Sequence, residues 1–280
     1  MSRHLICLSF DFDALSGWIA RGLTTPTPMS RGEFGAVGAK RILALLAKNN
    51  IRSTWFIPGV TIDTYPDICR SITDAGHEIG HHGWTHVPPA NLTRSIEAEH
   101  LKRGNEAIHK LSGHPARGYR SPSWDLSAHT IGLLIENEFV YDSSMMGHDH
   151  HPYRARCDDV ITEEGSVQFG DPTNLIEMPV SWTLDDYPYF EFIRTDSMTL
   201  PGLSTARDVL KNWLDDFTYM CQTEHWGILT YTFHPFVIGR GHRMMILEEL
   251  ISALTDQGAI FTTMADAAEE FLKREPLNTV

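Results

Sequence analysis

Residues 5–13 read Leu-Ile-Cys-Leu-Ser-Phe-Asp-Phe-Asp, an apolar run that ends in two alternating acids. The apolar part predicts a buried strand over residues 5–10. At a period of two, Asp11 and Asp13 point to the same face. Two carboxylates this close repel each other unless a cation or a proton lies between them. The stretch therefore predicts a strand with a candidate site at its end; for this pair alone, solvated loop acids or a helix cap are the alternative.

Outward from this strand, short apolar runs alternate with amphipathic segments. Further strands are expected at residues 53–57, 78–80, 118–120, 175–180, 227–233 and 259–263. Helices are expected at residues 37–48, 65–75, 93–111, 127–137, 205–221 and 244–255. This alternation predicts a parallel sheet with helices packed outside it. Because barrels of roughly 250 residues commonly form one domain, we expect residues 1–280 to form a single α/β barrel, with an open doubly wound sheet as the alternative.

Composition excludes some classes of function. The formal net charge of -13 repels nucleic-acid phosphates. No stretch approaches the roughly 20 apolar residues of a membrane helix, and the first apolar run is too short for a signal peptide. The four cysteines form no CxxC pair, which favours free thiols in a reducing compartment. We therefore expect a cytoplasmic protein that binds neither nucleic acid nor membrane.

The segment of residues 147–173 is long and polar, with little periodicity. A loop of that length in a compact domain is usually functional. Its composition predicts a functional loop or a cover over a site.

Residues 77–86, His-Glu-Ile-Gly-His-His-Gly-Trp-Thr-His, contain four histidines. Imidazole is the usual neutral metal ligand near neutral pH. His82 and His86 stand four residues apart, which would place both rings on one side of a helical turn. His77 and His81 share that spacing, but His81 ends the expected strand whereas His82 begins the following loop. The pattern indicates a metal site formed by His82 and His86; surface histidines with one core histidine are the alternative.

Two later strand ends carry further polar residues. Arg120 lies in residues 118–124, Gly-Tyr-Arg-Ser-Pro-Ser-Trp, and an arginine there can bind a carboxylate through two parallel hydrogen bonds. His234 ends the strand expected at 227–233 and could act as a general acid–base near neutral pH. Taken alone, each signal is weak, because a surface arginine or a hydrogen-bonded core histidine would explain it.

The order and spacing of these groups are more specific than any one of them. An acid pair on the first strand, HxxxH after the third, Arg-x-Pro after the fourth and a late His-Pro resemble the polysaccharide deacetylase family (carbohydrate esterase family four). The resemblance extends from about Leu5 to Phe271. The run Met-Pro-Val-Ser-Trp-Thr-Leu-Asp-Asp-Tyr-Pro-Tyr-Phe of residues 178–190 resembles a branch that includes peptidoglycan deacetylase-like proteins and cyclic imide hydrolases. A metal-independent allantoinase is a more distant relative.

The resemblance implies a distorted (β/α) barrel, seven-stranded, of the polysaccharide deacetylase type. Residue by residue, it implies the metal ligands Asp13, His82 and His86, the base Asp11 with its partner Arg120, and the general acid His234. Family members usually hold zinc, and some use cobalt or nickel. The expected walls of the substrate pocket are Trp124, Trp182, Asp185 and Tyr187.

The sequence departs from the family pattern in two places. Phe12 stands between the acids and Ala14 follows them, where the wider family has two adjacent acids and a glycine. This departure bears on the assignment of Asp11 as the base. The acid of the family's fourth motif has two candidates, Asp185 and Asp186, and we place both at the pocket rim.

The implied reaction is hydrolysis of a carbon–nitrogen bond other than a peptide bond. Two histidines and one carboxylate leave open positions on a divalent metal, which can activate water and polarise a carbonyl. The substrate is an N-acetylated amino sugar or polysaccharide, or a small cyclic imide or related cyclic amide. A non-catalytic carbohydrate-binding homologue is the third hypothesis, and the retained metal ligands argue against it. The resemblance also implies a homo-oligomer. For His234, we expect the ordinary histidine pKa of about 6.5.

Overall fold

The centre of the molecule is a curled, predominantly parallel sheet. The computed structural model describes residues 2–194 and 199–276, and within them this sheet has nine strands. They are β1 (Arg3–Asp11), β2 (Thr54–Ile57), β3 (Glu78–His81), β4 (Gly118–Tyr119), β5 (Tyr141–Asp142), β6 (Tyr153–Arg156), β7 (Pro172–Glu177), β10 (Trp226–Phe233) and β11 (Ile260–Phe261). Their order is β10-β1-β2-β3-β4-β5-β7-β6, with β11 beside β1. Only β6 of these described strands runs antiparallel to its neighbour.

This order confirms the predicted distorted barrel. The path from β10 to β7 contains seven parallel strands, and it lacks the reversal of strand order that marks a doubly wound sheet. In the described part of the chain, β10 does not pair with β7 or β6. An isolated bridge between Asp185 and Thr232 crosses this gap, and the N–H of Ile228 donates to the carbonyl of His150 at 2.9 Å. The sheet is therefore an incompletely closed barrel.

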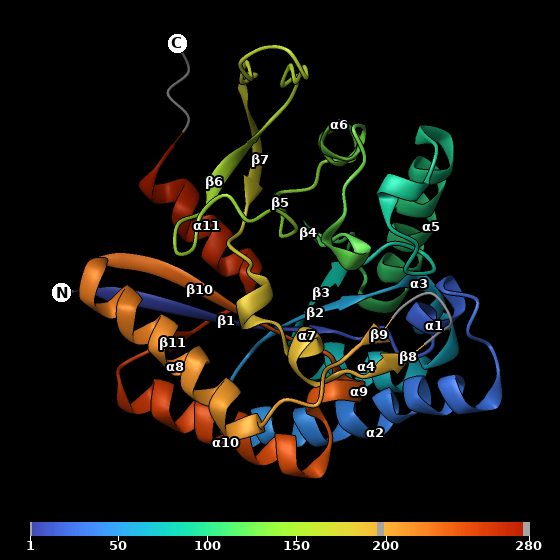
Figure 1. The fold of residues 1–280 in the computed structure, drawn as a ribbon, viewed down its shortest axis with the longest axis vertical. Coiled ribbons are helices and arrows are strands. Elements are labelled where there is room, and N and C mark those ends of the chain that lie inside the picture. The colour runs from blue at the N-terminus through green and yellow to red at the C-terminus, as the bar shows by residue number, and fades with distance from the viewer. Residues whose placement is uncertain (1, 195–198, 277–280) are drawn as a thin grey trace.

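Helices cover the outside of this sheet. The longer ones are α2 (Pro26–Lys48), α4 (Pro66–Asp74), α5 (Arg94–Ser112), α6 (Thr130–Glu136), α8 (Ala206–Thr223), α10 (Gly241–Asp256) and α11 (Met264–Arg274). Short helices α1 (Ser16–Ala20), α3 (Gly59–Thr64), α7 (Asp186–Phe190) and α9 (Pro235–Ile238) follow strands, and β8 (Ile193–Arg194) pairs with β9 (Thr199–Leu200) in a separate hairpin. In Figure 1, α2, α8 and α10 lie along one side, α5 lies on another, and the β6–β7 hairpin projects away from the body.

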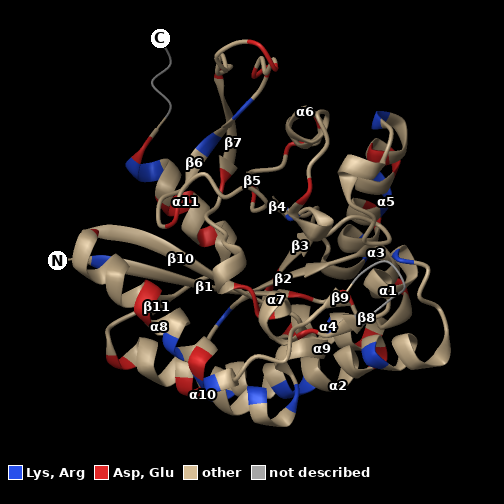
Figure 2. Ribbon diagram, viewed as in Figure 1, with Lys and Arg blue, Asp and Glu red and all other residues tan. Residues whose placement is uncertain are grey.

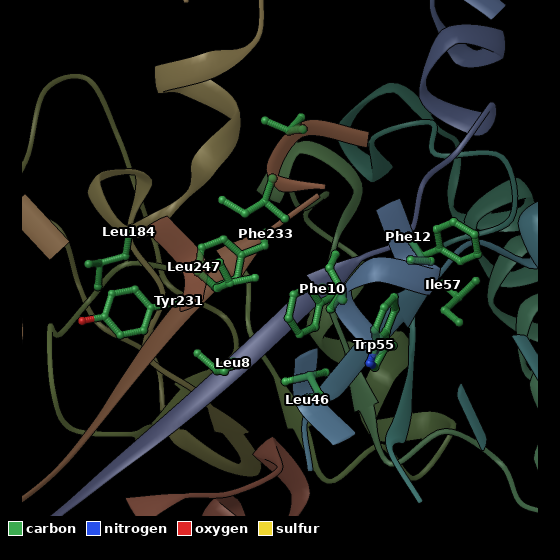
Figure 3. Close-up of a cluster of buried hydrophobic side chains, with 14 of the residues drawn as sticks. Leu8, Phe10, Phe12, Leu46, Trp55, Ile57, Leu184, Tyr231, Phe233 and Leu247 are labelled. Carbon is green, nitrogen blue, oxygen red and sulfur yellow. The ribbon is translucent and has the colours of Figure 1, made fainter. Parts of the chain in front are cut away.

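The main core lies between the sheet and these helices. Figure 3 shows Phe10 and Trp55, which stack with ring centroids 4.7 Å apart, together with Phe233 from the neighbouring strand. Phe10 and Phe233 lie 5.6 Å apart and occupy the same register position of β1 and β10. These rings are fully buried. Burial of this kind stabilises a side chain by roughly 1.5–3 kcal/mol, so the core fixes the ends of β1 and β10 relative to each other.

Helix α2 begins at Pro26 rather than at residue 37, where the sequence predicts its start. Its first half contacts the core through small residues, among them Gly32 and Gly35, which give no hydrophobic signal. Position 38 requires glycine because the backbone of Pro235 comes very close to it. A Cβ at Gly38 would lie 1.9 Å from the carbonyl oxygen of Pro235. Gly38 therefore lets α2 pack closely against α9, directly after His234.

The segment of residues 147–173 differs from its predicted role. It forms β6 and the loop of the β6–β7 hairpin, and it contributes no residue to the cavity described below. The interpretation as a cover over that cavity was therefore wrong. Two further elements were not predicted from the sequence. Strand β5 has only two residues. At the start of α11, the Thr263 side chain accepts a hydrogen bond from the N–H of Asp266.

Charged side chains lie mainly on the outer helices, whereas β10 carries none (Figure 2). All four cysteines are free, as predicted. No helix in the described ranges combines the length and apolar character needed to cross a bilayer. The single-domain boundary at residues 1–280 stays a prediction.

Candidate active site

A cavity of about 240 Å³ opens where the parallel strands end. Most of its walls come from residues at or after the ends of β1, β3, β4, β7 and β10, which a parallel sheet brings to one edge. The lining residues are Asp11, Asp13, Arg21, His82, His86, Ser123, Trp124, Trp182, Asp185, Tyr187, Pro188, Leu200 and His234. Nine of the ten site residues that the sequence predicts lie here; Arg120 is the exception.

The first group in this cavity is Asp13, His82 and His86. All three are buried, and their ligand atoms lie within 4.8 Å of one another. His82 Nε2 lies 3.3 Å from Asp13 Oδ1, and His86 Nε2 lies 3.4 Å from Asp13 Oδ2. His82 Nδ1 lies 2.7 Å from the carbonyl oxygen of Arg120 and donates to it, which directs Nε2 at the carboxylate. Such a carbonyl contact commonly orients a metal-binding histidine.

The loop that carries both histidines is not a helical turn. Gly83 (φ 70) and His86 (φ 59) have left-handed backbone conformations, and the segment is a series of bends. The predicted proximity of His82 and His86 is confirmed, with ring centroids 5.0 Å apart, but the helical explanation was wrong. Tertiary packing fixes the loop, in part through the N–H of Gly83, which donates to His81 Nδ1 at 3.1 Å.

The other two histidines of residues 77–86 are structural. His81 is fully buried and its Nε2 lies 3.0 Å from the carbonyl oxygen of Leu101. Burial lowers the pKa of His81 to about 3. His77 accepts a hydrogen bond from the N–H of Ser53 at 3.1 Å. Neither contributes to the cavity lining.

The second group is Asp11 with Arg120. Arg120 is fully buried beneath the cavity, and its Nη1 donates to Asp11 Oδ1 and to the Ser9 hydroxyl, both at 2.8 Å. Its Nη2 donates to the hydroxyl of Ser143 at 3.0 Å, and its guanidinium lies 4.3 Å from the ring centroid of Phe56. The ion pair leaves Asp11 Oδ2 facing His82 Nε2 at 3.8 Å. Arg120 therefore orients Asp11 without reaching the cavity itself.

The third group is His234 with two consecutive acids. His234 Nδ1 lies 2.8 Å from Asp186 Oδ1 and 3.5 Å from Asp185 Oδ1, while its Nε2 faces Asp13 Oδ2 at 3.8 Å. Burial alone would lower the pKa of His234, but the two carboxylates raise it to about 10. The ordinary value of about 6.5 was therefore the wrong expectation for this histidine.

The sequence predicts both acids at the pocket rim, and the structure contradicts this. Asp185 and Asp186 are both buried. Asp185 precedes α7 and accepts a hydrogen bond from the N–H of Tyr187 at 2.7 Å. Asp186 accepts from both the backbone N–H and the ring of His234. Sequence reasoning thus missed Asp186 as the partner of His234, and the Asp-Asp dipeptide was the signal for it.

Burial and charge also prepare the three residues of the first group. Burial lowers the pKa of His86 to about 4, so its ring is neutral at neutral pH. Burial opposes ionisation of Asp13, but the neighbouring imidazoles of His86 and His82 lower its pKa below the usual range. A neutral imidazole beside an ionised carboxylate is the donor set that a divalent transition metal prefers.

An aromatic wall borders these polar groups. Trp124 and Trp182 stack with ring centroids 4.1 Å apart, and Tyr187 lies 5.2 Å from the ring of His234. Ser123 and Trp124 both have positive φ angles, 57° and 53°. Such conformations cost about 1–3 kcal/mol each and cluster at functional sites. The strained turn presents Trp124 to Trp182 and closes one side of the cavity.

Comparison with known proteins identifies the family. A polysaccharide deacetylase family model matches residues 33–141. A peptidoglycan deacetylase of Helicobacter pylori is 33% identical over 286 residues, covering 97% of both chains. A polysaccharide deacetylase structure from Mycobacterium smegmatis superposes with a TM-score of 0.84 at 32% identity, over 98% of this chain and 91% of the other. An allantoinase structure shares the fold (TM-score 0.79, 20% identity, 98% and 92% coverage). The chain belongs to the polysaccharide deacetylase family.

Proposed function

We propose that this protein is a metal-dependent hydrolase that removes the acetyl group from an N-acetylated amino sugar or polysaccharide. The observation that carries the proposal is the convergence of Asp13, His82 and His86 in a cavity that also contains Asp11 and His234. A carbohydrate-binding homologue without activity would need neither a buried ligand set nor a histidine held by two acids.

The residues of the first group fit a divalent metal. Asp13 Oδ1 and His82 Nε2 are buried and have no hydrogen-bond partner among the described residues. Metal–ligand bonds of about 2.0–2.2 Å in tetrahedral geometry place neighbouring ligand atoms about 3.4 Å apart. The observed separations from Asp13 are 3.3 Å to His82 and 3.4 Å to His86. Two imidazoles and a carboxylate favour zinc, with cobalt and nickel as alternatives.

The remaining residues divide the proton transfers between them. When bound, the metal polarises the substrate carbonyl and lowers the pKa of water. Asp11, held by Arg120, accepts a proton from the water that attacks the carbonyl carbon. His234, protonated because of Asp185 and Asp186, donates a proton from Nε2 to the leaving nitrogen as the carbon–nitrogen bond breaks. The products are the free amine and acetate.

The size of the cavity supports a second candidate, hydrolysis of a small cyclic imide or related cyclic amide. Its volume of about 240 Å³ lies below the roughly 300–1,000 Å³ of pockets that enclose drug-sized ligands. A single small ring between the Trp124–Trp182 wall and His234 would present its carbonyl to the same groups. A sugar polymer would need to place only one acetamido group in this space.

One substrate panel separates the candidates. The zinc-loaded protein is assayed with N-acetylglucosamine, acetylated chito-oligomers, succinimide, glutarimide and hydantoin, following acetate release or ring opening. Amino-sugar deacetylation lost in Asp11→Asn but retained in Asp125→Asn, an exposed acid outside the cavity, supports the first proposal. Ring opening alone supports the second. No turnover of any compound by protein that retains its metal would contradict both.

A further inference from the structure

Arg21 lines the cavity and its charge is not balanced by an acid in the described residues. It follows α1, is exposed, and its Nη1 donates only to the carbonyl of Gly17, at 3.2 Å. Of the other arginines near the cavity, Arg31 pairs with Glu191 and Arg120 pairs with Asp11. Arg21 is thus the arginine of this region whose planar donors remain available to a ligand.

The position of Arg21 relates it to the reaction centre. A Cβ built on Gly17 would lie 3.3 Å from Arg21 Nη1 and 3.8 Å from His86 Nδ1, so both side chains border the same small space. The guanidinium also lies 5.8 Å from the ring centroid of Tyr187. Arg21 therefore stands between a proposed metal ligand and the aromatic wall, on the side of the cavity that α1 forms.

The pairing of charges around the cavity leaves Arg21 to an anionic ligand. Asp11 is paired with Arg120, and His234 faces both Asp185 and Asp186. Asp13 is the carboxylate of the proposed metal site. In the described residues none of these acids forms an ion pair with Arg21, so its guanidinium is an unpaired positive charge on the wall, although the whole chain has a net charge of -13. An arginine fork matches a carboxylate with two parallel hydrogen bonds.

We infer that Arg21 is a specificity-determining residue that binds a carboxylate on the substrate. This inference rests on the proposed function, and it narrows the substrate class to amides that carry an acidic group beside the scissile bond. Helix capping by the bond to Gly17 is the competing explanation. Capping would stabilise α1 without distinguishing acidic from neutral substrates.

Two pairs of compounds that differ by one carboxylate test the inference. N-acetylmuramic acid is N-acetylglucosamine with an added carboxylate-bearing ether, and hydantoin-5-acetic acid is hydantoin with an added acid. The parent should show a kcat/KM up to about fivefold higher for the acidic member of the pair it hydrolyses, the ratio expected for a partly exposed ion pair. Raising the salt concentration from 50 to 500 mM should reduce this ratio by screening.

The variants separate recognition from folding. In Arg21→Gln the ratio should fall to about one, mainly through a higher KM for the acid, and Arg21→Lys should keep part of it. Arg94→Gln, which removes an exposed arginine paired with Glu136, should leave the ratio unchanged. Equal ratios in the parent and in Arg21→Gln would overturn the inference.

A binding measurement keeps this test separate from the proposed function. Tryptophan fluorescence of the zinc-loaded protein is titrated with all four compounds, because Trp124 and Trp182 line the cavity. Tighter binding of the acids that disappears in Arg21→Gln supports the inference even where no compound is hydrolysed. Equal binding of acidic and neutral members would refute it even if hydrolysis occurs.

Discussion

Two buried carboxyl groups near the site allow a quantitative prediction about stability. Glu177 Oε1 accepts hydrogen bonds from the N–H groups of Ser144 (2.8 Å) and Met145 (2.7 Å), and Asp142 Oδ1 accepts one from the Ser144 hydroxyl (2.7 Å). The other two oxygens, Asp142 Oδ2 and Glu177 Oε2, are buried and accept no hydrogen bond from the other described residues. One proton held between Asp142 and Glu177 satisfies both. The cluster adjoins Ser143, which holds Arg120.

This arrangement makes the folded state bind a proton that the unfolded chain releases. Burial raises the pKa of Asp142 to about 6, and burial together with the neighbouring Asp142 carboxylate raises the pKa of Glu177 well above its usual value. A group whose pKa is higher in the folded state stabilises the fold fully below its unfolded pKa, about 3.9 for aspartate. That stability is lost as the pH rises through the folded value. A difference of two units corresponds to about 3 kcal/mol.

The perturbation is Glu177→Gln. The amide oxygen keeps both backbone hydrogen bonds, and the amide N–H donates to Asp142 without a titrating proton. Between pH 4 and 7 we expect the free energy of unfolding of the parent to fall by about 2–3 kcal/mol relative to that of the variant. Urea unfolding followed by circular dichroism at each pH measures this difference. Glu164→Gln, at an exposed acid in the β6–β7 loop, is the control and should follow the parent.

Parallel profiles for the parent and Glu177→Gln would refute the reasoning. They would show that the pair does not retain a proton in the folded protein. A variant that is less stable at every pH would show instead that the two backbone hydrogen bonds were lost.

Three further predictions concern the site and assembly. Removing the metal should abolish hydrolysis, and full activity of the metal-stripped protein would instead favour allantoinase-like, metal-independent chemistry. The substitution His86→Ala should weaken metal affinity by roughly 10- to 100-fold or more, measured by elemental analysis. The control His114→Ala, at an exposed histidine, should leave metal affinity unchanged. The raised pKa of His234 keeps its acid form through neutral pH. The high-pH limb of the kcat profile should therefore lie well above pH 6.5, and it should move to lower pH in Asp186→Asn. An unchanged profile in this variant would show that His234 is not the acid of the reaction. The family resemblance predicts a homo-oligomer, which a monomer in sedimentation at micromolar concentration would contradict.

The strands and most site residues were predictable from sequence because their signals are local. Continuous apolar runs such as residues 5–10 indicate buried strands, and polar residues directly after them fall at one edge of a parallel sheet. β5 was not predictable, since two residues carry no periodicity. The first half of α2 was not predictable either, because its buried face is made of glycines that hydrophobicity does not detect.

The conformation around the site depends on contacts that the sequence does not specify. A spacing of four residues is compatible with a helical turn, but the left-handed residues Gly83 and His86 bring the same two rings together by another route. Asp185 and Asp186 are chemically identical neighbours. Which one bonds His234 depends on where α7 begins against β10, and that is set by tertiary packing.

The balance of buried charge supports the proposed metal more directly than the motif does. Burying a charge is costly unless it is paired. Arg120 balances Asp11, and His234 faces Asp185 and Asp186. Asp13 faces three imidazoles, His82 at 3.3 Å, His86 at 3.4 Å and His234 at 3.8 Å. Of these, His86 is neutral and His234 is already held by two other acids. Although burial opposes it, the carboxylates of Asp11 and Asp13 raise the pKa of His82. In the metal-free protein a proton on His82 Nε2 would therefore balance Asp13, and added zinc would displace that proton, so that the protein releases acid on binding. Proton release measured during a zinc titration, absent in Asp13→Asn, would identify Asp13 as the carboxylate that the ion neutralises.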